Sequence, residues 1–294
     1  MNGFVILNKK EGVTSFKAAA CLRRIFSEKK TGHTGTLDPM ATGVLPVALG
    51  KATRFIDFIP QTDKGYRARF SCGIVTDTLD ITGSVISQRD VSVTRQEIEA
   101  VLGDFRGDIM QLPPMYSAIS KDGVRLYELA RKGIEVEREK RAVQIKKLEL
   151  TAYEDKNEFE IEVICSKGTY IRSLVSDIGE SLGTGAVMTS LERTLANGFS
   201  LSDARTQEEL SELGERALLG TDYPFMCYPA VTVTDNQARR FSNGGELSSD
   251  RLKAEIMPSL YRVYAPGNVF LGLGEIKEDD ISILWARRVI GNDK

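Results

Sequence analysis

The sequence predicts an α+β protein with a mainly antiparallel sheet flanked by helices, followed by a small β barrel at the carboxyl end. Segments with strand-like alternation and segments with helical periodicity are interspersed up to about residue 222, without the regular rhythm of a parallel βαβ fold. After Asp222 the chain changes to short apolar runs broken by Gly244-Gly245, Pro266-Gly267 and Gly272, which is typical of a small β domain. Its 294 residues suffice for one large domain and one small one.

The first sixty residues predict a strand, a capped helix and a loop. The apolar run at residues 4–7 indicates a short buried strand, and Thr14 or Ser15 can cap a helix that continues through Arg24. Residues 32–43 contain three glycines and no clear period, so we expect a loop there. A strand over residues 45–49 and a short helix over residues 52–59 follow.

Two alternating segments and one capping box fix the expected middle of the chain. Residues 66–72 alternate with period two, which places both arginines of this segment on one face of a strand. Residues 159–163 alternate between apolar and acidic side chains, so one face is expected to be buried and the other to face water. Thr94 and Glu97 have the spacing of a capping box that opens a helix toward Leu102. Further expectations are a break at residues 112–115, a helix over 126–131 and a turn at 166–169 leading into a helix that ends near residue 182.

Composition and cysteine usage favour a cytoplasmic protein. The four cysteines are far apart and form no CxxC pair, a pattern usual for buried thiols in a reducing compartment; they are Cys21, Cys72, Cys165 and Cys227. The first ten residues lack the order of charge and apolar run that a signal peptide has, and no apolar run has the length of a membrane span. We therefore expect no membrane association.

The charge is segregated along the chain. The formal net charge of −2 argues mildly against nucleic acid, but binding depends on the local field. Between Lys121 and Lys147 there are nine basic residues against five acidic ones, among them Asp122. A solvated helix face of mixed charge is the alternative interpretation of this stretch.

Asp38 is the first candidate for chemistry. It lies in the glycine-punctuated loop before a proline, which restricts it to an extended conformation. A simple Asx turn is the alternative, although such a turn needs far fewer constrained residues. His33 is the only histidine. A catalytic triad of His33 and Asp38 is disfavoured because the loop contains no nucleophile elbow. A metal site is disfavoured because one histidine without clustered cysteines or carboxylates supplies too few ligands. A structural or RNA-contacting role is expected for His33.

Seven segments of the chain resemble, in order, the TruB family of tRNA pseudouridine synthases. The resemblance runs over roughly residues 3–200, and the tail is only loosely similar to the PUA type of RNA-binding module. The segments are residues 8–15, 32–46, 64–66, 76–80, 114–118, 123–133 and 166–172.

The resemblance implies a pseudouridine synthase fold and the isomerisation of uridine 55 in the T loop of tRNA, on a flipped-out base and without metal or cofactor. It implies residues 1–225 as the catalytic domain, with an RNA-gripping insertion at about 112–144, and residues 226–294 as a PUA-like RNA-binding domain. A monomer is expected. The resemblance makes Asp38 the essential carboxylate, Tyr66 the ring against the target base and Arg172 the partner of Asp38. The substrate-binding residues that it implies are His33, Lys9, Tyr170, Leu191, Arg54 and Asp80.

The chemistry suits these residue types. One carboxylate can break the glycosidic bond, either by attacking the anomeric carbon or by removing a sugar proton, because the base is recaptured and water has only to be excluded. Burial would neutralise Asp38, so a bidentate pair with Arg172 is expected to keep it ionised. Core packing is the alternative role of Tyr66, and a surface position on a helix is the alternative for Arg172.

Three positions depart from the family pattern, and two other functions stay open. Lys10, Val187 and Glu192 replace residues that are usually different, and we expect these changes at the RNA-facing periphery, where they affect tRNA preference. A protein that grips the T arm without turnover is one alternative, although it would not need Asp38, Tyr66 and Arg172 together. A guide-RNA-dependent relative is another, although the intact basic insertion favours independent action.

Overall fold

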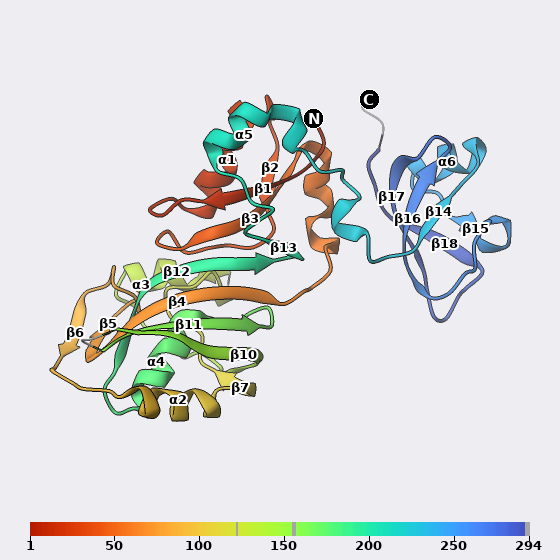
Figure 1. Cartoon of the computed structure of the whole chain (residues 1–294). Coiled ribbons are helices and arrows are strands. Elements are labelled where there is room, and N and C mark those ends of the chain that lie inside the picture. The colour runs from red at the N-terminus through yellow and green to blue at the C-terminus, as the bar shows by residue number, and fades with distance from the viewer. Residues whose placement is uncertain (122, 155–156, 292–294) are drawn as a thin grey trace.

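The computed structural model describes residues 1–121, 123–154 and 157–291. These residues form a nine-stranded sheet in the order β1-β3-β12-β4-β11-β10-β7, with β2 beside β3 and β13 beside β12 (Figure 1). Within this sheet β12 pairs with β3 in parallel and the other ladders are antiparallel, which confirms the predicted α+β class. The strands are β1 (Gly3–Lys9), β2 (Thr31–His33), β3 (Thr42–Leu49), β4 (Lys64–Cys72), β7 (Gly107–Gln111), β10 (Arg141–Glu154), β11 (Glu158–Cys165), β12 (Ala186–Ala196) and β13 (Phe199–Ser200).

Two pairs of helices pack on different parts of this sheet. Helices α1 (Ser15–Ile25) and α5 (Gln207–Leu213) lie by β1 and β3, whereas α2 (Arg95–Asp104) and α4 (Ile171–Ser181) lie by β4, β11 and β10 (Figure 1). The predicted caps are confirmed. Thr14 accepts a hydrogen bond from the Lys17 amide at 3.2 Å, and Thr94 and Glu97 form both halves of a capping box. These local signals therefore set where the helices begin.

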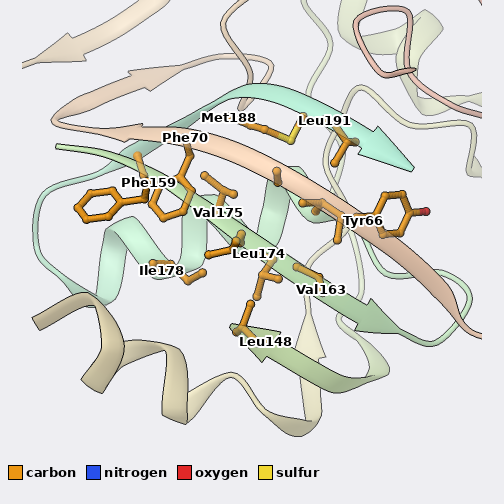
Figure 2. Close-up of a cluster of buried hydrophobic side chains, with 14 of the residues drawn as sticks. Tyr66, Phe70, Leu148, Phe159, Val163, Leu174, Val175, Ile178, Met188 and Leu191 are labelled. Atoms are coloured by element: carbon orange, nitrogen blue, oxygen red, sulfur yellow. The ribbon is translucent and has the colours of Figure 1, made fainter. Parts of the chain in front are cut away.

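The main core lies between α4 and the central strands (Figure 2). The rings of Phe70 and Phe159 stack across β4 and β11 at 5.2 Å, and Leu174, Val175 and Ile178 on α4 pack toward them. Helix α4 is thereby fixed against the sheet along its apolar stripe. Its first turn is the part that reaches the candidate site.

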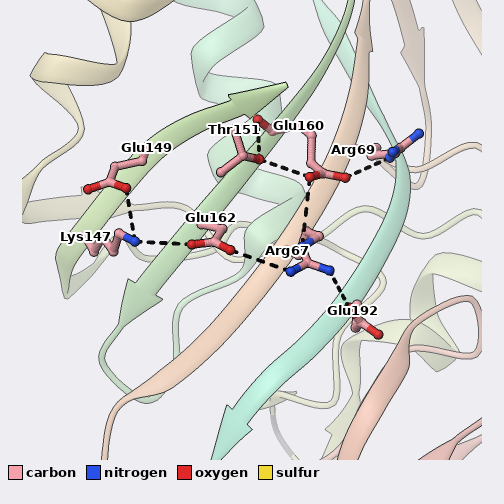
Figure 3. Close-up of polar contacts among 8 residues, drawn as sticks. All are labelled: Arg67, Arg69, Lys147, Glu149, Thr151, Glu160, Glu162 and Glu192. Carbon is pink, nitrogen blue, oxygen red and sulfur yellow. Dashed lines mark hydrogen bonds and ion pairs between the residues drawn. The ribbon is translucent and has the colours of Figure 1, made fainter. Parts of the chain in front are cut away.

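The opposite face of these strands carries an ion-pair network, here called the outer-face network (Figure 3). Arg69 Nε lies 2.9 Å from a Glu160 oxygen, and Arg67 Nη1 lies 3.3 Å from a Glu192 oxygen. The acidic residues predicted to face water are therefore paired with basic ones, because the β4 arginines share their face as expected. Its members are Arg67, Arg69, Lys147, Glu149, Thr151, Glu160, Glu162 and Glu192.

The predicted loop over residues 32–43 was wrong at both ends. Thr31–His33 forms β2 and pairs with β3, which itself begins at Thr42. The expected helix over residues 52–59 is a 3₁₀ helix, η1 (Gly50–Phe58), and the helix over 126–131 is confirmed as α3 (Leu126–Arg131). The remaining small elements here are β5 (Ile74–Thr76), β6 (Val85–Gln88), β8 (Ser120–Lys121), β9 (Val124–Arg125), η2 (Gly214–Ala217) and η3 (Tyr223–Phe225).

The carboxyl-terminal part is a five-stranded sheet in the order β14-β16-β17-β18-β15. It packs beside η1, where the Phe55 ring lies 6.1 Å from that of Phe225 and 5.8 Å from that of Phe270. A helix here was not anticipated, although Thr234 and Gln237 form a capping box at its start. The elements are β14 (Ala230–Thr232), α6 (Asp235–Ser242), β15 (Leu247–Ser248), η4 (Ser249–Arg251), β16 (Ser259–Ala265), β17 (Val269–Ile276) and β18 (Ile283–Val289).

The burial of the cysteines was predicted correctly for some of them. Cys72 and Cys165 are buried as expected and Cys21 is half-buried, but Cys227 is exposed, so that prediction was wrong for Cys227. Asp122 of the basic stretch lies outside the described residues. None of the helices in the described part of the chain is long and apolar enough to cross a membrane.

Replacing Gly43 by alanine is expected to destabilise the fold more than replacing Gly198. Both glycines have positive φ, +97° and +81°, so both variants incur a backbone cost of about 1–3 kcal/mol. A Cβ on Gly43 would lie 2.3 Å from the Arg193 carbonyl oxygen, whereas one on Gly198 would meet nothing within 4 Å. Urea unfolding should therefore show a further loss of about 1–3 kcal/mol for Gly43→Ala. Equal losses in the two variants would contradict the close approach.

Candidate active site

The Asp38 loop connects β2 to β3 and is fastened to helix α1. The Ser15 hydroxyl accepts from the Leu37 amide at 2.7 Å and donates to the Leu37 carbonyl at 3.0 Å. The Ala41 amide donates to the Asp38 carbonyl at 3.1 Å, which closes a turn over the proline. The residue before the proposed carboxylate is thus fixed by two hydrogen bonds from one side chain.

Arg193 holds the same loop from behind and was missed in the sequence. It is fully buried on β12, and its guanidinium donates from Nε to the Val44 carbonyl at 2.8 Å, from Nη2 to Gly35 at 3.1 Å and from Nη1 to Thr36 at 3.4 Å. The signal that could have revealed it is an arginine two residues after Leu191, on the inward face of an alternating strand. A buried cation there has to find carbonyl partners.

Lys9 supports the loop from the β1 side. Only 1% of it is exposed, and its Nζ donates to the carbonyls of Lys10, Val13 and Pro39 at 2.9, 2.6 and 3.1 Å. Burial lowers the pKa of Lys9 to about 8, while Asp38 opposes that shift. The predicted substrate-binding residue therefore has its three donors engaged by backbone carbonyls.

The structure brings Asp38 and Arg172 together. Arg172 Nε lies 2.9 Å from Asp38 Oδ2, and only 4% of the Arg172 side chain is exposed. The prediction of a bidentate pair between Arg172 and Asp38 was wrong. The other two nitrogens of Arg172 donate to the carbonyls of Thr78 and Tyr116 at 2.9 and 2.8 Å, so one contact remains for Asp38.

Asp80 is a second carboxylate beside Arg172. Its Oδ2 lies 3.8 Å from Arg172 Nη1, and its Oδ1 accepts from the Thr78 and Thr82 hydroxyls at 2.9 and 2.5 Å and from the Thr82 amide at 3.0 Å. Asp80 is 7% exposed, whereas Asp38 is 34% exposed. Asp38 is therefore the member of this group that solvent or a substrate reaches.

The charges around Asp38 act in opposite directions. Burial raises the pKa of Asp38 above its ordinary value, the Arg172 guanidinium lowers it, and the Asp80 carboxylate raises it again. The net shift is upward, so the surroundings hold the ionised form less well than water does. The carboxylate is more basic than a free aspartate.

Tyr66 lies at the end of the main core, near Leu191 (Figure 2). Both residues are 7% exposed, so the core-packing role is real. The strand register places Tyr66 opposite Arg193. Burial raises the pKa of Tyr66 to about 12, and Arg193 opposes that shift.

The other predicted residues lie on three further elements: His33 on β2, Tyr170 at the start of α4 and Arg54 on η1. His33 is half-buried on β2 with no partner on Nδ1, and burial lowers its pKa, as does Arg193. Tyr170 is half-buried at the start of α4, where its backbone exchanges two hydrogen bonds with the Gln111 side chain, and burial raises its pKa. The structure places Arg54 elsewhere, donating to the Ile290 carbonyl at 3.1 Å.

The three departures from the family pattern are placed differently. Lys10 pairs with Glu208 at 2.6 Å on the surface, and Glu192 belongs to the outer-face network. Val187 is 1% exposed, so its expected position at an RNA-facing periphery was wrong, because the surrounding structure covers this side chain. In the described residues there is no group of three acidic, histidine or cysteine side chains that could hold a metal ion.

Asp38→Asn is expected to stabilise the protein at neutral pH. Because the pKa of Asp38 is raised on folding, its contribution to stability is present below the unfolded pKa of about 3.9 and is lost as pH rises through the folded pKa. The difference in free energy of unfolding between variant and wild type should therefore grow as the pH rises above about 4. A variant that is less stable than wild type at pH 7 and equal at pH 4 would reverse the sign of the shift.

Comparisons with known proteins identify the family of the chain. The family described as "TruB family pseudouridylate synthase (N terminal domain)" matches residues 23–171, and two TruB carboxyl-terminal families match residues 172–219 and 229–290. A protein named tRNA pseudouridine synthase B from Clostridium perfringens (strain 13) is 45% identical over 282 residues, covering 95% of this chain and 96% of its own length. One of the same name from Chromobacterium violaceum is 44% identical over 284 residues, covering 95% and 92%.

Two solved structures share the fold over nearly the whole chain. The crystal structure of a Cbf5-Nop10-Gar1 complex gives a TM-score of 0.74 at 25% identity and covers 98% of this chain and 84% of that one. An H/ACA RNP bound to a substrate RNA containing 2'-deoxyuridine gives 0.73 at 23% identity, covers 99% and 85%, and shows likeness of fold. By the match of its first family over residues 23–171 and its full-length relatives, the chain belongs to the TruB family of pseudouridylate synthases.

Proposed function

We propose that this protein isomerises uridine 55 in the T loop of tRNA to pseudouridine. The observation that carries the proposal is the ion pair at 2.9 Å between Arg172 and a partly exposed Asp38, in a chain of this family. The relatives at 40–45% identity are named tRNA pseudouridine synthase B, whereas the chains from the Cbf5-Nop10-Gar1 complex and the H/ACA RNP share only 23–25%. The higher identity to the tRNA pseudouridine synthases favours an enzyme that acts on tRNA without a guide RNA.

Asp38 is the group that breaks the glycosidic bond in this proposal. Its raised pKa makes it a better nucleophile or base than a free carboxylate, and the contact with Arg172 keeps it ionised enough to act. It either attacks the anomeric carbon of the flipped nucleotide or removes a sugar proton. Asp80 orients Arg172 through the 3.8 Å contact.

Tyr66 supports the base while it turns. Its ring, backed by Leu191 and the core, offers a flat surface on which an extruded base can stack, an interaction worth about 1–3 kcal/mol. A hydroxyl with a pKa of about 12 is a poor base for the C5 proton at neutral pH, although Arg193 stabilises its anion. Stacking is therefore the first role we assign to Tyr66.

The remaining RNA contacts belong to the surroundings of the loop. We propose residues 1–225 as the catalytic domain, residues 112–144 as the part that grips the T arm and residues 226–294 as a PUA-like RNA-binding domain. We assign RNA contacts to His33, whose Nδ1 has no partner, and to Tyr170, while Lys9 holds the loop. Arg54 contacts RNA near the carboxyl-terminal domain. A cytoplasmic monomer fits this scheme.

Tritium release from C5-labelled uridine in a T-arm tRNA transcript tests the reaction. Wild type should release tritium and Asp38→Asn should not, because the amide can neither attack nor take a proton. Tyr66→Phe should retain most of the rate if stacking is its role, and a loss of more than about 100-fold would instead give the hydroxyl a proton-transfer role. No release by wild type, with tRNA still bound, would favour a binding protein without turnover.

Arg172→Lys is expected to lower the single-turnover rate by about 100-fold or more. One ammonium cannot replace the Asp38 contact and both carbonyl bonds, and each carbonyl left unpartnered costs about 1–3 kcal/mol of stability. Arg106→Lys is the matched control, because Arg106 also donates to a backbone carbonyl, that of Leu148, away from the Asp38 loop. Comparable rates for the two variants at a temperature where both are folded would remove Arg172 from the mechanism.

A further inference from the structure

Lys64, the first residue of β4, has no hydrogen-bond or ion-pair partner among the described residues. It precedes Tyr66 by two positions, so strand alternation places both side chains on the same face of the sheet. The neighbouring carboxylate of Asp63 is engaged by Lys146 at 2.9 Å. An unpaired ammonium therefore lies on the face of the sheet that carries Tyr66, two residues before it along the strand.

A second cation lies against the same point of the Asp38 loop. The position that a Cβ of Gly35 would occupy is 3.5 Å from Lys64 Nζ and 3.7 Å from Arg193 Nη1. Burial, Arg193 and Lys167 lower the pKa of Lys64 to about 8, while the Cys165 thiol opposes that shift. Like charges gathered without a counter-charge cost free energy unless an anion joins them.

Lys64 is the member of this group that can reach a ligand. Arg193 is fully enclosed and directs its guanidinium at loop carbonyls. Lys64 is half-buried, so its ammonium group is enclosed less completely than the Arg193 guanidinium. Its three donors are available to an incoming oxygen anion.

We infer that Lys64 binds a backbone phosphate of the RNA next to the target uridine, with Arg193 and Lys167 adding positive potential behind it. This inference rests on the proposed function, because Tyr66 marks where the extruded base stacks. The two residues are separated by about 7 Å along the strand, within reach of the phosphate that flanks a stacked base. Such a contact would hold the distorted backbone while the base is out of its stack.

The salt dependence of tRNA binding tests the inference. Kd for a T-arm tRNA is measured from 50 to 300 mM NaCl in an Asp38→Asn background, with Lys64→Met, Lys64→Arg and the control Lys147→Met. Lys64→Met should reduce the slope of log K against log [salt] by about 0.7–1, as expected for one lost phosphate contact. Lys64→Arg and Lys147→Met, the latter changing the outer-face network, should keep the wild-type slope.

A pH series distinguishes a charged contact from a packing effect. Affinity of the Lys64 protein should weaken between pH 7 and pH 9 as the ammonium deprotonates, and Lys64→Arg should remove that component. An unchanged salt slope in Lys64→Met overturns the inference, whether the thermal midpoint stays the same or falls. Tritium release by the unmutated enzyme is measured separately. If the unmutated enzyme releases tritium but Lys64→Met keeps the salt slope, only the phosphate site is rejected. If Lys64→Met changes the salt slope but the unmutated enzyme releases no tritium, only the proposed reaction is rejected.

Discussion

The geometry of the site depends on the hydrogen bonds that the Arg193 guanidinium donates to the carbonyls of the Asp38 loop. A fully buried cation on β12 holds the carbonyls at the beginning and end of the Asp38 loop, and the close approach of Gly43 to its backbone leaves the loop little freedom. The same side chain lies opposite Tyr66 in the strand register. One residue thus positions the carboxylate loop relative to the ring, and neither could move without leaving a buried charge unsatisfied.

The electrostatics of Asp38 result from opposing effects of similar kind. Arg172 favours the ionised carboxylate, while burial and Asp80 disfavour it. Because Arg172 is shared with two carbonyls and a second carboxylate, it stabilises Asp38 less than a dedicated bidentate partner would. The surroundings therefore hold the Asp38 carboxylate in a comparatively unstable charged state, a frequent property of functional sites.

Local patterns predicted local structure well. The caps at Thr14 and Thr94 and the alternation of β4 and β11 needed only neighbouring residues, and the class of fold followed from them. The meeting of Asp38 with Arg172 came from the family resemblance, not from any period in the chain. Arg193 and the pairing of β2 with β3 were missed because they depend on strand register between distant segments, which no local pattern encodes. The bidentate pair failed because competing carbonyls are invisible in sequence.

The outer-face network has a consequence for how a polyanion meets this protein. Its three basic and four acidic side chains pair with one another (Figure 3), on the face of the sheet opposite the main core. That face carries no net positive charge, whereas the ammonium group of Lys64 lies on the other face beside Gly35. The two faces of this sheet therefore differ in local charge in spite of the near-zero total charge of the chain, and a polyanion would not be attracted to them equally.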